Sequence, residues 1–432
     1  MHLAQRAYVL SVLTATLAIV ALWADEPALT GLWKIPAVLL LAGLAFEGFF
    51  LHRAGITACV EVAPRAFLGR PTPAAFTIRN STSRPLSIQY VPVLPQGFEP
   101  MRQIRAVSAP ALGVGRDVVS LLPIRLGRQT WPVVPGRVLG PLGLAWWTRE
   151  LHPSADVSIA PDTYGHAHAR PRGNPLGPRP RRAVGAGSEL HQLRGYTPGD
   201  PLGRIDWKAS ARARQLVSRE FSEDQHLDIL IAIDAGRFSR VPAGRLDRLG
   251  LYANIAARFA EVAIPNDDRV GLLVYSDRVL TVCPPGRGLP AMVRLRRALE
   301  RLSVQPAESD ATEAAVRIRS MLRHRGLVVL LTDLDSLADA GQISRVVRLL
   351  SPPHLIVVAG VHNREVAELS DREARDWVDP WVALAAQEHE VRVSSQRVLL
   401  RRLGAPVVMA TEALLEQSVI AEYERLRRTR RV

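Results

Sequence analysis

The densest group of side chains able to do chemistry lies in residues 188–226, which we call the signature segment. Arginine and lysine alternate with aspartate along it. Guanidinium forks that face carboxylates form a cross-linked polar network, which holds a fixed geometry where every member is paired. We therefore expect a rigid, charged surface. Its candidate site residues are Arg194, Tyr196, Pro198, Gly199, Asp200, Arg204, Asp206, Trp207, Lys208, Ser210 and Arg212.

A reaction centre is the alternative interpretation of residues 188–221. Ser210 would be the nucleophile of a membrane-bound, hydrolase-like enzyme, with Lys208 beside it and His191 or Asp206 assisting. On an extended segment Lys208 and Ser210 would share a face, because side chains alternate along a strand. Ser–Lys pairs also arise by chance, and we find no H-E-x-x-H, phosphate-binding loop or G-x-S-x-G motif. The preferred expectation is therefore that the chain is not an enzyme.

Aspartates at two strand ends form the second group of candidate residues. Residues 227–233 (LDILIAI) are a continuous apolar run that ends at Asp234, and residues 327–331 (LVVLL) end just before Thr332 and Asp333. Such runs are typical of buried parallel strands, whose carboxyl ends carry the sites of α/β proteins. The alternative is that both aspartates only cap strand-to-helix turns.

The pattern around these aspartates predicts a doubly wound α/β domain over residues 227–432. Further strands are expected at 269–275 (RVGLLVY) and 354–361, and a helix at 246–262. Strands that alternate with helices indicate a mostly parallel sheet. The domain ends in a basic helix from Glu412. Its apolar face is expected to dock on the domain, while its arginines could contact a membrane or a partner.

A different pattern occupies residues 53–160, ahead of the signature segment. Short β-branched stretches such as 86–94 (LSIQYVPVL) alternate with proline, glycine and polar turn clusters, and no adequate helical period is present. A small all-β, antiparallel sandwich is therefore predicted there. Residues 161–187 follow as a linker rich in proline, glycine and arginine. We expect this linker either to be a solvated hinge or to touch anionic lipid headgroups.

Two apolar runs within residues 1–52 predict a membrane helical hairpin. Residues 7–23 contain no charge, and residues 35–51 contain only Glu47. Each run would span about 26 Å as a helix, the short end of what a bilayer requires. We interpret Glu47 as a carboxylate that snorkels to water near the cytoplasmic end of its helix, with a functional intramembrane acid as the alternative.

The charges that flank these runs predict their orientation. Arg6 precedes the first run and several arginines follow the second, whereas the intervening loop has only Lys34 as a cation. By the positive-inside rule, both termini and all later domains lie in the cytoplasm, and the chain crosses the membrane twice. A cleaved signal peptide ending near Ala24 is the competing interpretation. Its cleavage site is poor, because Leu22 and Trp23 are not small residues.

Composition limits the classes of function. The formal net charge is +14, and only two of the 55 cationic residues are lysines. The positive charge is spread along the chain and is not gathered into one aromatic-lined patch, so nucleic acid is not expected as a partner. The alternative, a nucleic-acid-binding protein, predicts an affinity for DNA or RNA that falls steeply as the salt concentration rises. Cys59 and Cys283 lie far apart in sequence, which excludes a disulfide scaffold and a zinc ribbon.

The signature segment resembles the hallmark of the bacterial membrane-protein family known as domain of unknown function 58. That motif runs approximately R-x-Y-x-P-G-D, then R-x-I-D-W-K-x-S-A-R, and ends in L-x-V-R-E. This sequence departs from it at Ser218, and two smaller patches, 125–127 (RLG) and 141–144 (PLGL), also agree with the family. The matching residues are Arg194, Tyr196, Pro198, Gly199, Asp200, Arg204, Ile205, Asp206, Trp207, Lys208, Ser210, Ala211, Arg212, Leu216, Val217, Arg219 and Glu220.

The resemblance implies a protein anchored in the bacterial inner membrane, whose C-terminal half resembles a von Willebrand factor A domain. Genes of the family tend to accompany MoxR-type AAA+ ATPases and transglutaminase-like membrane proteins. The implied partner is therefore such an ATPase or another von Willebrand A-like protein. Because the biochemical activity of the family is not established, the resulting expectation is a non-catalytic scaffold or adaptor that binds proteins.

A von Willebrand A domain also implies where a metal ion would bind. Its adhesion site combines a D-x-S-x-S stretch, a threonine and the aspartate of a T-D pair, whose oxygens suit Mg²⁺. Here Gly236 and Phe238 replace both serines, and Arg237 adds a positive charge that could pair with Asp234 instead. A degenerate magnesium site is one expectation, and capping aspartates without any cofactor are the other. The candidate ligands are Asp234, Ser309, Thr312 and Asp333.

Overall fold

The computed structural model describes residues 2–23, 31–162, 184–185, 189–222, 226–334 and 340–428. The chain divides into two compact units. The first contains the residues up to 163 together with 237–257 and 296–306, and the second contains 164–236, 258–295 and 307–432. The expected linker at 161–187 lies almost entirely outside the described residues, as do the loop at 24–30 and the last four residues.

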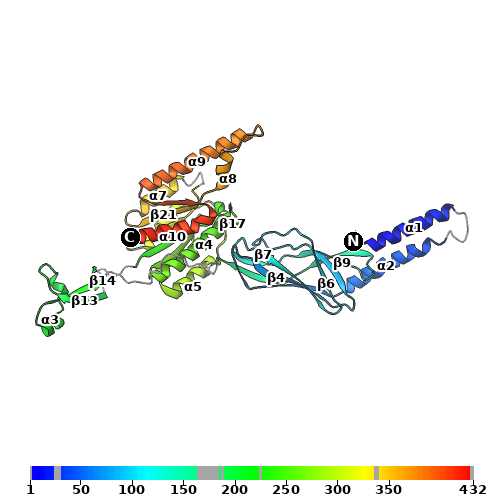
Figure 1. Ribbon diagram of the computed structural model, residues 1–432, viewed down its shortest axis with the longest axis horizontal. Helices are drawn as coiled ribbons and strands as arrows, with labels where there is room; N and C mark the ends of the chain where they lie inside the picture. The colour runs from blue at the N-terminus through cyan, green and yellow to red at the C-terminus, as the bar shows by residue number, and fades with distance from the viewer. Residues whose placement is uncertain are drawn as a thin grey trace. The chain divides into compact units, whose positions relative to one another are not determined.

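Two apolar helices open the first unit, as the sequence predicts (Figure 1). Helix α1 spans Gln5–Trp23 and helix α2 spans Lys34–Arg53, and both are long and apolar enough to cross a membrane. Signal sequences and buried core helices can pass the same test of length and composition. The expectation that Glu47 snorkels to water is wrong, because its side chain is fully buried against the β region that follows.

The β region runs from Ile56 to Ala160 and, together with the N-terminal strand β1, forms three sheets of short strands. Their orders are β1-β10-β9-β5-β6, β2-β4-β7 and β3-β11-β8, and the named strands pair antiparallel except for β3 with β11. The antiparallel β region expected from the sequence is therefore present, and its description as a sandwich stays a prediction. The strands are β1 (His2–Leu3), β2 (Ile56–Val62), β3 (Arg65–Phe67), β4 (Thr72–Asn80), β5 (Leu86–Tyr90), β6 (Arg105–Ala109), β7 (Val114–Leu121), β8 (Gly127–Thr130), β9 (Val134–Leu139), β10 (Ala145–Leu151) and β11 (Asp156–Ala160).

One apolar core lies inside these three sheets. Alternate residues of the strands point inward, so that Ile88 of β5 and Val138 of β9 are completely buried. Phe76 packs against Tyr90 and Trp131, with ring centroids 5.3 and 5.9 Å apart. The alternation of apolar and polar residues that predicts strands from the sequence therefore also determines which side chains form this core.

The signature segment forms a small antiparallel sheet with a short helix. Strand β14 (Val217–Ser222) lies between β12 (Val184–Gly185) and β13 (Glu189–Gly195). The connection from β13 to β14 contains the 3₁₀ helix η1 (Leu202–Arg204) and the helix α3 (Trp207–Ala213). Ile205 and Ser218 form a β-bridge, and each is only 2% exposed. The helical connection therefore folds back onto the sheet.

A six-stranded sheet is the framework of the second unit. Its order is β19-β18-β15-β20-β21-β22, and every pair is parallel except β18 with β19. Counted from β15, this is the order 3-2-1-4-5-6 of doubly wound α/β folds. The strands are β15 (Asp228–Asp234), β18 (Arg269–Tyr275), β19 (Val279–Gly286), β20 (Leu327–Leu331), β21 (Leu355–Val361) and β22 (Val407–Ala410).

Helices alternate with these strands, as predicted. Ile318 and Val347, which are almost fully buried, pack against the sheet residues Leu330 and Val358 in one core. The helices are α4 (Arg248–Ala263), α5 (Gly288–Leu299), α6 (Ala311–Met321), α7 (Ala340–Leu350), α8 (Arg364–Ser370), α9 (Asp379–Arg402) and α10 (Glu412–Arg428). The chain also forms the 3₁₀ helices η2 (Arg237–Arg240) and η3 (Ile264–Asn266) and the short hairpin of β16 (Pro242–Ala243) and β17 (Leu246–Asp247).

The last helix, α10, docks on the second unit beside β21 (Figure 1). Its buried residues include Leu415, Val419 and Tyr423, which confirms the expectation that its apolar face packs on the domain. The ring of Tyr423 lies 4.9 Å from that of Phe259 in α4, and its hydroxyl donates to the fully buried Asp268. Burial raises the pKa of this carboxyl group.

Candidate functional site

A tight turn after β13 begins the network of the signature segment. The N–H of Asp200 donates to the carbonyl of Thr197 at 3.0 Å, and Gly199 has a φ of +112°. The ring of Pro198 fixes φ at the second position of the turn, and glycine tolerates the positive φ at the third, as in a type II turn. Proline and glycine at these two positions therefore account for the sharp reversal of the chain after β13.

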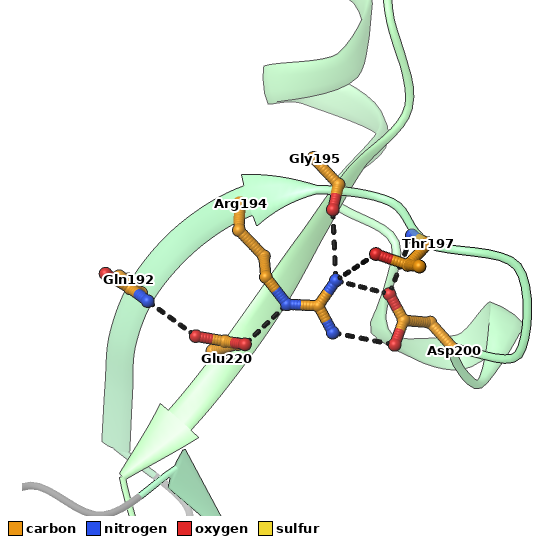
Figure 2. Close-up of polar contacts among 6 residues, drawn as sticks. All are labelled: Gln192, Arg194, Gly195, Thr197, Asp200 and Glu220. Carbon is orange, nitrogen blue, oxygen red and sulfur yellow. Dashed lines mark hydrogen bonds and ion pairs between the residues drawn. The ribbon is translucent and has the colours of Figure 1, made fainter.

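Arg194 is the centre of the polar network, as Figure 2 shows. Its Nη1 and Nη2 atoms donate to the two carboxylate oxygens of Asp200 at 2.8 and 2.7 Å, and its Nε donates to Glu220. Nη1 also donates to the Gly195 carbonyl at 3.0 Å and to Thr197 Oγ1 at 2.9 Å. One guanidinium thus joins β13, the turn and β14 through charge-assisted hydrogen bonds.

Both carboxylates of this network accept further hydrogen bonds. Gln192 Nε2 donates to Glu220 at 2.6 Å, and the N–H of Thr197 donates to Asp200 at 3.0 Å (Figure 2). The hydrogen bonds from Arg194 lower the pKa of Asp200. A carboxylate that stays ionised well below neutral pH is poorly suited to act as a general acid or base, so these contacts favour a structural role.

Ser210 lies on helix α3 and not on an extended segment, which corrects the expected geometry. Residues two apart on a helix do not share a face, so Lys208 and Ser210 point in different directions. Helix α3 begins where Asp206 Oδ1 accepts the N–H of Ala209 at 2.9 Å. Ser210 Oγ donates to the carbonyl of Asp206 at 2.7 Å and accepts the N–H of Val217 at 2.8 Å. The buried hydroxyl group therefore fastens α3 to β14.

The outer surface of the signature segment combines apolar and cationic side chains. Trp207 is 67% exposed and Leu202 is 70% exposed. Lys208 and Arg212 are exposed as well, and neither forms an ion pair with any residue that the structure describes. The sequence analysis missed Leu202, although an apolar residue within so charged a stretch is a signal for a contact surface.

The other predicted residues of this segment have more limited roles. Arg204 is half-buried, and its charge contributes to the lowered pKa of Asp200. The N–H of Tyr196 donates to the carbonyl of Leu216 at 2.8 Å, next to the end of the β13–β14 ladder. Arg219 Nε lies 3.6 Å from a carboxylate oxygen of Asp206, and the N–H of Ala209 lowers the pKa of that aspartate. The side chain of His191 lies outside the part of the chain that is described.

The second group of residues lies at the carboxyl ends of β15 and β20, the neighbours at which the strand order reverses. Ligands of α/β proteins bind at such switch points. Asp234 Oδ1 accepts hydrogen bonds from Ser309 Oγ and from the N–H of Gly236 at 2.9 Å, and Oδ2 accepts one from Thr332 Oγ1 at 3.0 Å. Burial raises the pKa of Asp234, so desolvation outweighs these hydrogen bonds.

Ser309 occupies the space beside Gly236. A Cβ atom at Gly236 would lie 2.1 Å from Ser309 Oγ, so a serine could not be added at that position while Ser309 stays in place. Ser309, one of the predicted ligands, is bonded to Asp234, and so is Thr332, which was not among the predicted residues. Thr312 is the second residue of α6, and its N–H donates to the capping residue Asp310 at 2.9 Å.

The strand-end residues fit a magnesium ion poorly. Mg²⁺ requires a near-octahedral set of oxygen ligands. The hydroxyl groups of Ser309 and Thr332 both donate to Asp234. The buried Asp333 adds only one further carboxylate to the possible ligands. Within the described ranges, no three His, Cys, Asp or Glu side chains are grouped so that they could hold a metal ion. We therefore interpret Asp234 as a link between strand ends. Its predicted pairing with Arg237 stays a prediction.

The fold and the network together define a doubly wound α/β protein with a charged hairpin before its central strand. Residues 192–401 match the model of the family described as "Protein of unknown function DUF58". The chain thus carries a DUF58 family domain over these residues, as the motif resemblance predicts.

Named relatives and structures show weaker similarity. The "Uncharacterized protein Mb1516" of Mycobacterium bovis and the "Uncharacterized protein Rv1480" of Mycobacterium tuberculosis are each 25% identical over 191 residues, which is 43% of this chain and 59% of theirs. The match thus spans less than two thirds of these relatives. The conserved hypothetical protein BatB from Bacteroides thetaiotaomicron is 13% identical with a TM-score of 0.30, over 45% of this chain and 99% of BatB. An uncharacterized membrane spanning protein from Vibrio fischeri is 13% identical with a TM-score of 0.18, over 46% and 97%. TM-scores this low carry no argument.

Proposed function

We propose that this protein is a membrane-anchored, non-catalytic scaffold that binds a protein partner through its signature segment. The observation that carries the proposal is the separation of two surfaces within that segment. The polar groups of Arg194, Asp200 and Ser210 are bonded to the chain itself. Trp207 and Leu202, by contrast, face outward on the same small frame.

A rigidly presented tryptophan favours binding over catalysis. Tryptophan is among the residues that dominate the free energy of protein–protein association when it enters a pocket of the partner. Because the backbone around Trp207 is fixed by the cap of α3 and by the Arg194 network, little further ordering would be needed on binding. A nucleophile needs a hydroxyl group that a base can reach, and the hydroxyl of Ser210 is bonded to two backbone groups.

Anchoring by α1 and α2 is the second part of the proposal. The helices contain 19 and 20 residues, which corresponds to about 28 and 30 Å and thus to the thickness of a bilayer core. By the positive-inside rule, Arg6 and the arginines after α2 support a cytoplasmic position for the two helix ends that adjoin them. The loop between the helices has only Lys34 as a cation. The proposed location is the bacterial inner membrane, with the later domains inside the cell.

We further propose that the sheet of the second unit belongs to a von Willebrand A-like domain. Support comes from its strand order, from the single antiparallel edge strand β19, and from Asp234 and Asp333 at adjacent strand ends. A second von Willebrand A-like protein or a MoxR-type AAA+ ATPase is the proposed partner. The ATPase is suggested by the family resemblance alone.

Two tryptophans of equal exposure provide a matched test. Trp207 in the signature segment is 67% exposed, and Trp381 in α9 is 66% exposed. The full-length protein is co-purified with its partner from native membranes, and the identified partner is then titrated against each variant. Trp207→Ala is expected to weaken binding at least about tenfold, the effect of removing an interface hot spot. Trp381→Ala is expected to bind like the unaltered protein.

Two outcomes would contradict the proposal. Equal binding by Trp207→Ala and the unaltered protein would place the binding surface outside the signature segment. Turnover of a small molecule that disappears after one substitution within residues 188–221 would support the alternative, a membrane-bound enzyme with its reaction centre in that segment.

A further inference from the structure

The hairpin of β9 and β10 ends in an uncharged, apolar tip, which we define as residues 138–148 (VLGPLGLAWWT). Arg137 and Arg149 border the tip on its two paired strands. Leu142 at the turn is 39% exposed, and the guanidinium of Arg137 lies 5.2 Å from the centroid of the Trp146 ring. Apolar segments bordered by cations and containing tryptophan are typical of the membrane–water interface.

The tip contacts the first turn of α1. Strand β1, which leads into that helix, pairs with Ala145 and Trp146 of β10. Arg6 Nη1 donates to the carbonyl of Leu142 at 3.0 Å. These contacts place the tip at the level of the N-terminal end of α1, which is the end proposed to lie at the cytoplasmic face of the membrane.

The tip also contacts α2, at two positions occupied by glycine. A Cβ atom at Gly43 would lie 2.5 Å from a methyl group of Leu144, and one at Gly48 would lie 2.8 Å from the ring of Trp147. Gly43 and Gly48 therefore let α2 approach the apolar side chains of the hairpin closely. The surface of the tip is thus continuous with the apolar surface of the two helices.

Glu47 is the one carboxylate in this contact, and it is bonded to the backbone of the tip. Its Oε1 accepts the N–H groups of Leu142 and Leu144 at 2.9 and 3.0 Å, and Oε2 accepts that of Ala145 at 3.0 Å. A Cβ atom at Gly140 would meet this carboxylate, so a larger residue there would displace Glu47 from its hydrogen bonds. These three backbone donors satisfy the polar oxygens of Glu47 without water, which lowers the cost of burying this side chain.

We propose that the tip is a third membrane contact, inserted into the cytoplasmic leaflet beside α1 and α2. The occupant of its exposed apolar surface is the lipid bilayer, because this surface continues the one formed by both helices. Arg6 and Arg137 have side chains long enough to reach lipid phosphates from this depth. The inference rests on the proposed anchoring by α1 and α2, and it adds the β region to the membrane-bound part of the chain.

Spin labels at three positions test the inference in the full-length protein, reconstituted in nanodiscs of phosphatidylcholine and phosphatidylglycerol. Cys59 and Cys283 are replaced by serine, and a nitroxide is attached to Leu142→Cys, Val133→Cys or Val12→Cys. Val133 is a matched control, since it is 45% exposed and precedes β9 at the end opposite the tip. Val12, 62% exposed on α1, reports on the anchoring itself.

The label at 142 is expected to collide with oxygen, which dissolves in lipid, several-fold more than with a polar nickel complex, as is the label at 12. The label at 133 is expected to show the opposite preference. Preference for nickel at 142 with preference for oxygen at 12 would overturn the inference and leave the anchoring intact. Preference for nickel at all three positions would overturn both. Protection of 142 from both reagents would also overturn it, because a protein would then cover the tip.

Discussion

The hydroxyl group of Ser210 links two elements through a donated and an accepted hydrogen bond. Its hydrogen bonds with the Asp206 carbonyl and the Val217 N–H join β14 to α3, the helix that carries Trp207. Arg194 does the same on the other side of β14, where one guanidinium engages two carboxylates and a turn. The side chains of this segment that could take part in a reaction are therefore used to stabilise its fold.

Replacing Ser210 with alanine is therefore expected to lower the free energy of unfolding of the signature segment by about 1–3 kcal/mol, because the buried N–H of Val217 loses its acceptor. Urea unfolding followed by amide exchange at Val217 measures this. Ser395→Ala is the control, since Ser395 makes a similar bond to the Val391 carbonyl but is exposed on α9. The control should change stability by less than about 0.5 kcal/mol. Unchanged stability together with lost function would instead indicate a nucleophile.

The sequence predicts which charged residues of the segment form a network but not how they pair. Several arginines and aspartates alternate there, and only the register of β13 against β14 brings Arg194 beside Glu220 and Asp200. That register depends on long-range strand pairing, which a local pattern does not contain. Thr332 was missed for a related reason: it meets Asp234 only because β15 and β20 are neighbours.

Among the elements, predictability follows the length of the pattern. The long apolar runs of β15, β18, β20 and β21 are recovered, whereas β22 has four residues and β19 carries two prolines, so neither stands out. Helix α3 was expected as an extended segment. Its signals were present, because Asp206 is a good capping residue and WKASARA consists mostly of good helix formers.

The strand ends give a prediction about metal ions. Because Asp234 is satisfied by donors of the chain, we expect millimolar Mg²⁺ to leave the thermal unfolding temperature unchanged relative to EDTA. A site occupied at one hundred times its dissociation constant would add about 2.7 kcal/mol of stability, which such a measurement detects easily. Stabilisation by Mg²⁺ that is absent in Asp234→Asn would show that this aspartate is a metal ligand after all.

At the scale of the whole chain, the sequence predicts the apolar helices and the α/β framework but not the burial of Glu47. Hydropathy records a single acid near a helix end, for which water is the usual partner. The structure supplies three backbone N–H groups from a turn about a hundred residues later, a pairing that only the folded β region creates.

A fusion assay addresses the orientation of the chain. Green fluorescent protein attached after Val432 should be fluorescent, and alkaline phosphatase at the same position should be inactive. The reason is that, by the positive-inside rule, the arginines outside the helical hairpin predict a cytoplasmic C-terminus. Alkaline phosphatase inserted in the loop at residues 24–30 should be active. An active phosphatase at the C-terminus would reverse the proposed topology and, with it, the access of a cytoplasmic partner.

The position of β15 in its sheet has a consequence for biosynthesis. Of the six strands of this sheet, the central strand β15 leaves the ribosome first. Its neighbour β20 ends 97 residues after Asp234. At roughly 5–20 residues per second, one edge of β15 stays unpaired for about 5–20 seconds of translation. Unpaired apolar strands are prone to aggregate. Insertion of α1 and α2 into the membrane during synthesis, as proposed, would restrict the movement of the nascent chain while the sheet is completed.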